Sequence, residues 1–430
     1  MTEAPPAPRR RGFFGGRQPE CGAAAYFRPP EKNATARLPP MLSSKLPDVG
    51  VSIFSQMTLL AQQTGALNLA QGFPDYDPPL ALREALARHA LAAGSHQYAP
   101  MPGLPRLRQA IAAQVGRLQP DAPTPDADLE VTITAGATEA LYGVLAAVVR
   151  PGDEVIILEP AYDLYGPAVR LQGGVPRYVR LPTPHFRPDW AAVRAAVSAR
   201  TRLILVNSPH NPSGAVFSAA DWDELAALTE GTDILVLSDE VYEHLVFDGV
   251  PPRSARQHPA LRARSFVLSS FGKTYHATGW KVGYCLAPPA LSAELRRVHQ
   301  FVTFAVSTPT QHALADVLEA DPTDAHARGL AAFYQAKRDE FAGLLAGTDW
   351  ELLPVPGGYF QLAGYVAFSQ KNDLAFAGEL ARRWGVAVVP VSAFYHDGYD
   401  AGLVRFCFAK ESATLRAAAG RLAQPPPKSA

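Results

Sequence analysis

The feature that most constrains the fold is a regular succession of short apolar runs rich in Val, Ile and Leu. Stretches with helical periodicity, such as 138–149 and 219–228, separate most of them. Runs that are apolar along their whole length are typical of strands covered on both faces, and alternation with helices is typical of βαβ units. The sequence therefore predicts an α/β fold with a mostly parallel seven-stranded sheet. The strands are expected at 129–134, 154–159, 177–181, 202–207, 233–239, 265–269 and 281–286.

The interval between the last two runs is too short for a crossover helix, so one strand there is expected to be antiparallel. A helical region then extends from 309 to about 346, and mixed helices and strands follow it. This mixture predicts a smaller α+β domain. Its strands are expected at 359–363, 386–391 and 403–408, and its helices at 373–384 and 411–422.

The expected domain organisation follows from these patterns. Residues 1–44 are rich in Pro and Arg without apolar periodicity, which predicts a disordered tail. We expect 45–75 to form an N-terminal arm and part of the small domain. The large domain is expected at 76–324 and the small C-terminal domain at 325–430.

Composition excludes several classes of protein. The 40 Lys and Arg balance the 40 Asp and Glu, so there is no general attraction to nucleic acid or to an anionic membrane. The longest uncharged apolar run, 141–149, is far shorter than the ~20 residues that span a bilayer. The three Cys residues are far apart and no HExxH motif occurs. These features favour a reducing, cytoplasmic location and give no support to a catalytic metal.

Polar residues collect where the predicted strands end. Ligands of open parallel sheets bind beyond the carboxyl ends of the strands, so these residues are candidates for one site. Alone, Gly136 could be a tight turn, and Lys273 would usually be a surface lysine. Asp239, however, leaves an apolar strand and needs a cationic partner if it is buried. The residues in question are Gly136, Ala137, Thr138, Tyr162, Asn211, Asp239, Tyr242, Ser270 and Lys273.

This combination matches the needs of one cofactor, pyridoxal 5′-phosphate. Its aldehyde forms a Schiff base with a lysine, and its pyridine nitrogen is kept cationic by a buried carboxylate. Its phosphate is bound by hydroxyls and by a helix N-terminus. The lysine, once released on substrate exchange, can act as the base that moves the substrate Cα proton.

Three motifs in a fixed order then identify a family resemblance. They are NSPHNPSG at 207–214, SDEVY at 238–242 and SSFGKTYHATGWKVGY at 269–284. Together they resemble the fold-type I, class I/II aminotransferases, which are PLP-dependent transferases, and the likeness extends from about residue 45 to 422. The resemblance implies a large domain that binds pyridoxal phosphate and a reaction that transfers an amino group between an amino acid and a 2-oxo acid.

The resemblance also implies roles for individual residues. Lys273 would hold the cofactor and move the proton, and Asp239 would pair with the ring nitrogen. Tyr242 and Asn211 would bind the 3-oxygen of the cofactor, and Tyr162 would stack on its ring. The phosphate ligands would be Gly136, Ala137, Thr138, Ser270 and Lys281.

Further positions match family residues that contact substrate or a second subunit. Arg405 would grip the substrate α-carboxylate, with Asn211 and the backbone of Gly72 beside it. Tyr98 matches a tyrosine that crosses to the phosphate of the neighbouring subunit. The resemblance therefore implies a homodimer with a shared active site.

Within the family, the segments 46–57, 71–77 and 299–309 are most similar to the methionine aminotransferases and to the kynurenine aminotransferase/glutamine transaminase K enzymes. The expected side-chain pocket is Phe54, Tyr98, Phe301 and Phe304, with no second arginine. An aromatic, uncharged wall favours methionine, aromatic amino acids, leucine or glutamine over aspartate. Ordinary core packing is the alternative interpretation of these phenylalanines.

Three alternative functions are compatible with this chemistry or this fold. The carbanion that forms at the substrate Cα could also expel a thiolate from the β-carbon, which would make the enzyme a cysteine-S-conjugate β-lyase. Kynurenine aminotransferase activity is a further alternative. A ligand-sensing regulator of this fold would carry a DNA-binding domain. The first 44 residues show no helix-turn-helix pattern, so the regulator is disfavoured.

Overall fold

The computed structural model describes residues 43–424, so the predicted tail lies almost entirely outside the described residues. The chain divides by its contacts into Met1–Pro47 and Asp48–Ala430. In the first unit the only described residues are 43–47, where the amide of Leu46 donates to Oγ of Ser44.

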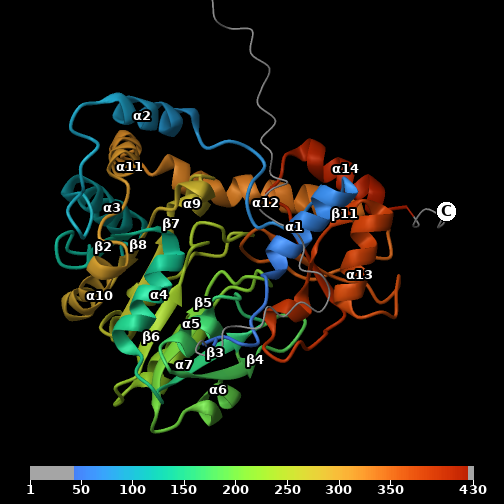
Figure 1. Cartoon of the computed structure of the whole chain (residues 1–430), viewed down its shortest axis with the longest axis horizontal. Coiled ribbons are helices and arrows are strands. Elements are labelled where there is room, and N and C mark those ends of the chain that lie inside the picture. Colours follow the sequence, from blue (N-terminus) through green and yellow to red (C-terminus); the bar gives the residue numbers. More distant parts are fainter. Residues whose placement is uncertain (1–42, 425–430) are drawn as a thin grey trace, which may run out of the picture. The chain divides into compact units, whose positions relative to one another are not determined.

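A seven-stranded sheet with the order β2-β8-β7-β6-β5-β3-β4 is the centre of the fold (Figure 1). Pairing is parallel from β7 through β6, β5 and β3 to β4, whereas β8 is antiparallel to both β2 and β7. The mostly parallel sheet and its antiparallel strand confirm the sequence prediction. The strands are β2 Val131–Thr134, β3 Glu154–Glu159, β4 Val175–Arg180, β5 Thr201–Asn207, β6 Leu235–Asp239, β7 Ser265–Ser270 and β8 Gly283–Leu286.

The apolar runs arise because both faces of the sheet are covered. In β3, Val155 and Ile157 pack into one hydrophobic cluster, while Ile156 and Leu158 pack into another on the opposite face. The first face is covered by α4 (Gly136–Val148), α5 (Tyr165–Leu171) and α10 (Pro289–Val302). The cluster on the other face contains residues of α2 Leu80–Leu91, α3 Pro105–Leu118, α6 Trp190–Ala196, α7 Ala219–Thr229, α8 Pro259–Arg262 and α11 Thr308–Ala320.

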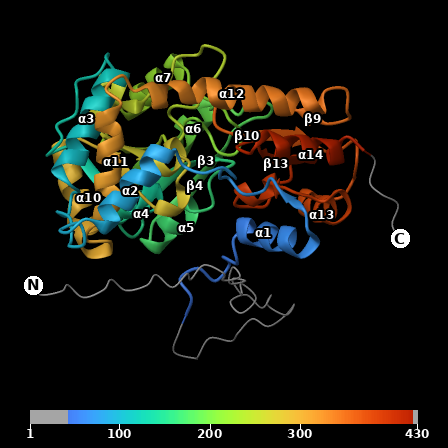
Figure 2. The same cartoon turned by 90° about the horizontal axis from the view of Figure 1, so that it is seen from above.

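The C-terminal part has its own sheet and core. Strands β12 (Val389–Pro390), β13 (Leu403–Cys407), β10 (Phe360–Gly364) and β9 (Glu351–Leu352) pair antiparallel in that order. Figure 2 shows the long helix α12 (Ala325–Leu345) extending from the helices of the large sheet toward β9. The hydrophobic core beside this smaller sheet contains residues of α1 Ile53–Thr64, α13 Asp373–Glu379, a π-helical turn at Leu380–Trp384 and α14 Ser412–Leu422.

The predicted strand 386–391 is divided between two sheets. β11 (Val386–Ala387) pairs in parallel with β1 (Leu67–Asn68), whereas β12 pairs with β13. The buried residue Val388 lies between the two strands, at the point where the chain changes partner. The segment before α2 is thereby joined to the C-terminal core. The domain boundaries expected from the sequence stay a prediction.

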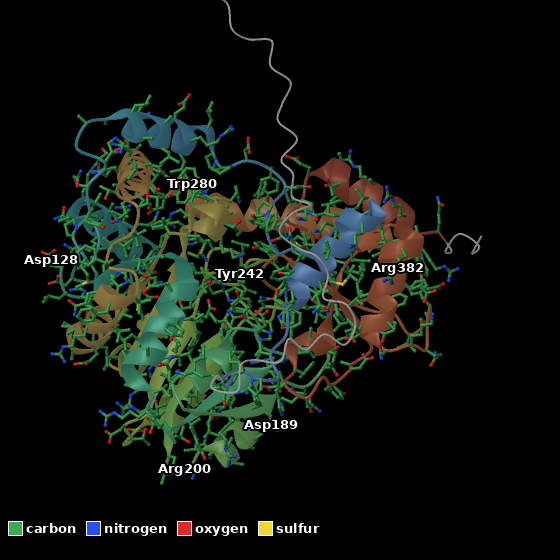
Figure 3. The ribbon with its side chains drawn as sticks, viewed as in Figure 1. Asp128, Asp189, Arg200, Tyr242, Trp280 and Arg382 are labelled. Atoms are coloured by element: carbon green, nitrogen blue, oxygen red, sulfur yellow. The ribbon has the colours of Figure 1, made fainter. Side chains whose placement is uncertain are left out.

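Polar and apolar side chains are sorted as expected for a protein in water. Figure 3 shows Asp128 and Arg200 at the periphery and Tyr242 in the interior, where it is 4% exposed. Among residues 43–424, no helix combines the length and the apolar character needed to cross a membrane.

Candidate active site

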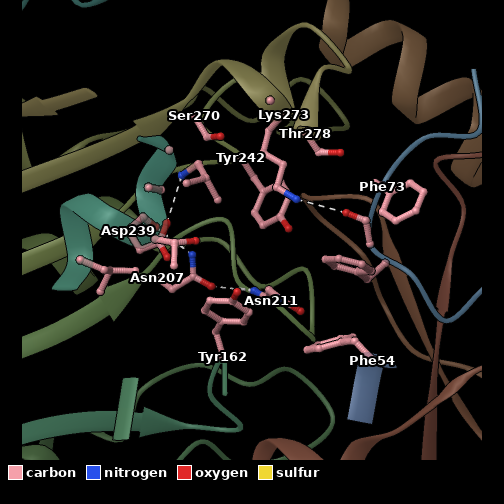
Figure 4. A pocket seen from close by; sticks show the side chains of 18 of the residues that line it. Phe54, Phe73, Tyr162, Asn207, Asn211, Asp239, Tyr242, Ser270, Lys273 and Thr278 are labelled. Carbon is pink, nitrogen blue, oxygen red and sulfur yellow. Dashed lines mark hydrogen bonds between the residues drawn. The ribbon is translucent and has the colours of Figure 1, made fainter. Parts of the chain in front are cut away.

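A cavity of about 280 Å³ lies beyond the carboxyl ends of β5, β6 and β7 (Figure 4). These strands deliver Asn207, Asp239 and Ser270 to one edge of the sheet. The opposite wall comes from α1, from the segment that follows β1, and from β10 and β13. The site is therefore built where parallel strands end, as the sheet rule predicts.

Lys273 lies on the short helix α9 (Phe271–Thr274), which follows β7 directly. Its Nζ donates to the carbonyl oxygen of Gly72 at 3.1 Å and to the phenol oxygen of Tyr359 at 2.9 Å. Burial lowers the pKa of this amine to about 8, because desolvation disfavours the charged form. An amine that is neutral for part of the time near physiological pH can act as a nucleophile or as a base.

Asp239 is the last residue of β6 and is 5% exposed. The phenol of Tyr165 donates to Oδ2 at 2.7 Å, and the backbone amide of Val241 donates to Oδ1. Both donors are neutral. Burial raises the pKa of this carboxyl, while its hydrogen bonds and Lys273 oppose the shift. A protonated pyridine nitrogen would give this carboxylate the cationic partner that its burial calls for.

The N-terminus of α4 faces the same cavity without a side-chain cap, because its N-cap residue is Ala135. The first amides of a helix otherwise need an acceptor, and a phosphate supplies one. Nζ of Lys281 donates to Oγ1 of Thr138 at 3.4 Å. A Cβ atom on Gly136, whose φ is +75°, would lie 3.3 Å from that Nζ. Glycine thus keeps open a small cationic cradle that fits a phosphate group.

Arg405 on β13 is 1% exposed at the far wall. It donates from Nη1 to Oδ1 of Asn211 at 2.7 Å and from Nη2 to the carbonyl of Ala70 at 2.9 Å. The ring of Phe360 lies 3.9 Å from the guanidinium carbon. Within the described residues, Nε of Arg405 is buried without a hydrogen-bond partner. Since no carboxylate among residues 43–424 is hydrogen-bonded to it, this guanidinium is suited to hold a substrate carboxylate.

Gly72, Tyr162 and Tyr242 complete the pocket. A Cβ on Gly72 would come 2.9 Å from Cζ of Phe360, so this position has no room for a side chain. Burial raises the pKa of Tyr162 to about 12 and raises that of Tyr242 further. Both phenols therefore stay neutral at physiological pH and can donate a hydrogen bond.

The structure brings most of the predicted site residues together. Those that line the cavity are Phe54, Gly72, Gly136, Ala137, Thr138, Tyr162, Asn211, Asp239, Tyr242, Ser270, Lys273, Lys281 and Arg405. Tyr98, Phe301 and Phe304 do not line it. Tyr98 and Phe301 are 82% and 87% exposed, and Tyr98 packs edge-on against Phe304. Their roles toward substrate and cofactor stay predictions.

Sequence reasoning missed several residues of the site. Tyr165, Tyr359 and Phe360 lie among apolar neighbours and carry no signal that separates them from core residues. Asn207 and Thr278 fall inside the recognised motifs, which could have indicated them. The lining residues missed are Gln71, Phe73, Leu141, Tyr165, Asn207, Val241, Gly272, Thr278, Val282 and Phe360.

The buried carboxylate, the buried amine and the uncapped helix N-terminus with its lysine together fit pyridoxal phosphate. Comparison with known proteins agrees with this chemistry. The profile of the family Aminotransferase class I and II matches residues 64–422. The chain belongs to this family of aminotransferases, and pyridoxal phosphate is its cofactor.

Individual relatives refine the position within the family. The chain is 51% identical to the methionine aminotransferase of Escherichia coli, over 89% of this chain and 97% of that protein. A crystal structure of the Escherichia coli enzyme covers 90% of this chain, and all of that chain is matched, with a TM-score of 0.86. The kynurenine–oxoglutarate transaminase of Dictyostelium discoideum is 32% identical, over 87% of this chain and 94% of that protein. These relatives confirm the fold and the subgroup predicted from the motifs.

Proposed function

We propose that the enzyme takes the amino group from an uncharged amino acid of the methionine type and passes it to a 2-oxo acid. The observation that carries the proposal is the aromatic lining of the cavity: the ring centres of Phe54 and Phe360 lie 5.2 Å and 3.9 Å from the guanidinium carbon of Arg405, and Phe73 lines the same cavity. Methionine packs well on aromatic edges through its flexible thioether. The methionine aminotransferase at 51% identity supports the same substrate.

The number of cations in the cavity also indicates that the side chain of the substrate is uncharged. Arg405 faces the aromatic wall and would bind the α-carboxylate, while Lys281 belongs to the phosphate cradle. Lys273 is engaged with Gly72 and Tyr359. No further Lys or Arg lines the cavity within residues 43–424. A second carboxylate, as in aspartate, would therefore lack a partner in this wall.

The proposed roles of the residues follow from their contacts. When bound, pyridoxal phosphate withdraws electrons from the substrate Cα and so acidifies its proton. Lys273 accepts that proton on Nζ. Asp239 keeps its negative charge beside the ring nitrogen, and Tyr165 holds the carboxylate in place. Arg405 orients the substrate through its carboxylate and thereby positions the Cα proton.

A screen of half-reactions tests the substrate class. The purified enzyme, loaded with pyridoxal phosphate, is mixed with each amino acid alone, and conversion of the cofactor to its amine form is followed by absorbance. Methionine, leucine, glutamine and the aromatic amino acids should react faster than aspartate or glutamate. Faster reaction with aspartate than with methionine would contradict the proposal.

Kynurenine and a cysteine S-conjugate belong in the same screen. The Dictyostelium discoideum relative is a kynurenine–oxoglutarate transaminase, so kynurenine is the second candidate substrate. The β-lyase activity stays a prediction. Release of pyruvate from the conjugate in the absence of any 2-oxo acid would establish it.

We also propose that the enzyme is a homodimer whose active sites are shared. The exposed aromatic side chains of Tyr98, Phe301 and Phe304 lie close together in sequence or in space, as expected of a surface that a second copy covers. If Tyr98 acts in the partner's site, Tyr98→Ala and Lys273→Ala subunits should each be inactive alone. Mixed dimers would contain one intact site, so mixing should restore activity. Failure of mixing to restore activity would contradict the shared site.

The cytoplasmic location stays a prediction, which the free thiols of Cys285 and Cys407 support.

A further inference from the structure

Tyr359 is a buried tyrosine for which neither the motifs nor the comparisons suggest a role. It directly precedes β10 and is 0% exposed. Its phenol oxygen lies 2.9 Å from Nζ of Lys273 and 2.6 Å from the carbonyl oxygen of Gly72. That carbonyl lies 3.1 Å from the same Nζ. The three polar atoms therefore contact one another in a closed triangle.

The direction of each hydrogen bond in the triangle is set by chemistry. The carbonyl of Gly72 can only accept, so the Tyr359 hydroxyl donates its one proton to it. The phenol oxygen is then left with lone pairs toward Lys273, whose N–H donates to it. Nζ thus has two acceptors, the phenol oxygen and the carbonyl oxygen.

Two acceptors determine the orientation of a free lysine amine. A neutral amine has two N–H bonds and one lone pair around a tetrahedral nitrogen. The two acceptors are 2.6 Å apart and within 3.1 Å of Nζ, so they lie on the same side of the nitrogen. When both N–H bonds incline toward that side, the lone pair occupies the one remaining position and faces away from the acceptors. After the nitrogen takes up a proton, the new N–H occupies that same position. The proton is therefore received and given back along one direction.

The acceptors themselves are held firmly. The ring of Tyr359 packs edge-on against Tyr242 at 5.0 Å and against Phe360 at 4.8 Å. Gly72 is fitted closely against the Phe360 ring. A positioning group is effective when its own rotamer is fixed by packing in this way.

We propose that Tyr359 is a positioning residue that, with the Gly72 carbonyl, holds the free ε-amino group of Lys273 and directs its lone pair at the substrate Cα. The proposal deepens the function above and rests on Lys273 as the base. Tyr359 itself neither gains nor loses a proton in this scheme. Its hydroxyl group keeps its proton and donates it in a hydrogen bond to the Gly72 carbonyl throughout.

The test compares Tyr359→Phe with Tyr334→Phe. Tyr334 is equally buried, and its ring lies 5.6 Å from that of Tyr359, but its hydroxyl bonds to Tyr76 and His276 instead. In Tyr359→Phe, the single-turnover rate with a saturating amino acid should fall by about 10- to 100-fold, the order expected for a misplaced catalytic group. KM should change little. The kinetic isotope effect with Cα-deuterated substrate should increase, because proton transfer becomes more strongly rate-limiting. Tyr334→Phe should leave all three unchanged.

A second readout uses the enzyme freed of its cofactor. The rate at which a small acylating reagent labels Lys273 is measured against pH by peptide mass spectrometry. Loss of the phenol oxygen removes an acceptor that favours the ammonium form, so the labelling midpoint should move to lower pH in Tyr359→Phe. An unchanged midpoint together with an unchanged isotope effect would overturn the proposal.

A subtler replacement guards against a folding defect. Site-specific 3-fluorotyrosine at 359 keeps the ring and its hydroxyl but weakens the oxygen as an acceptor. Its labelling midpoint should fall between those of the wild type and Tyr359→Phe; a value equal to the wild type would overturn the proposal. Failure of the underlying function is distinguished by Lys273→Ala, since full turnover by that variant would remove Lys273 as the base whatever Tyr359 does.

Discussion

The phenol of Tyr165 on α5 donates a 2.7 Å hydrogen bond to Oδ2 of Asp239, the last residue of β6. Both side chains are buried, and Tyr165 is T-shaped against Tyr162, which lines the cavity. A helix on one face of the sheet therefore fixes the carboxylate at its edge. The bond favours the charged form of Asp239, which burial disfavours.

Tyr165→Phe removes this donor while keeping the ring. The pKa of Asp239 should rise, because the charged carboxylate loses a hydrogen bond. The ring nitrogen of the cofactor would then be protonated less completely, and kcat should fall by roughly tenfold. The pH titration of the cofactor absorbance should shift together with kcat. Tyr178→Phe is the matched control, since Tyr178 stacks on His396 away from the cavity. Equal effects of the two variants would contradict the role of Tyr165.

Asp239→Ala should separate cofactor binding from catalysis. The phosphate cradle at Thr138 and Lys281 and the bond to Lys273 remain, so part of the cofactor should still be retained. The ring nitrogen loses its anionic partner, and the rate should drop by several orders of magnitude. Cofactor content is measured by absorbance and turnover by stopped flow. Near-normal turnover would contradict the role given to Asp239.

The rate of proton transfer should depend on the protonation of Lys273. Burial lowers the pKa of this amine to about 8, and only the neutral amine can accept a proton. The single-turnover rate should therefore rise about tenfold per pH unit below that value and level off above it. Single-turnover measurements between about pH 6 and pH 9 would show this limb, provided that substrate is saturating at each pH. A flat profile would exclude a titrating base in this range.

Arg405→Lys keeps the positive charge but loses the planar fork. Arg405 bonds simultaneously to Asn211 and Ala70 and stacks on Phe360, and lysine can reproduce none of this geometry. We expect kcat/KM to fall by about 10²-fold for both amino acid and oxo acid, while cofactor affinity stays unchanged. A specificity constant equal to that of the wild type would remove Arg405 from the site.

Much of the fold was predictable because the physics is local. Strands that bury both faces must be apolar throughout, so most strands of the large sheet could be placed from runs such as EVIILE in β3, whereas the edge strand β4 is partly exposed. The split of 386–391 could not be predicted. It depends on β1 and β13, two partners far away in the sequence, and the run itself is uniformly apolar.

The site shows the same division. Asp239 could be predicted because a carboxylate at the end of an apolar strand calls for a partner. Lys273 could be predicted because it follows a strand at the same edge of the sheet and belongs to the motif at 269–284. Tyr165 and Tyr359 could not, since a phenol in an apolar segment is as common in a core as in a site. Only their hydrogen bonds to Asp239 and Lys273, made across 74 and 86 residues of chain, distinguish them from packing residues.

The parallel pairing of β1 with β11 has a consequence for biosynthesis. Gly72 follows β1, and Arg405 lies on β13, so the substrate side of the cavity is assembled from the early and the late parts of the chain. Asp239 and Lys273 come from the middle. A nascent polypeptide still on the ribosome could thus acquire Asp239 and Lys273, which recognise the cofactor, before Arg405, which binds a substrate carboxylate. It would gain turnover only after β13 had been synthesised, as expected when folding begins during synthesis.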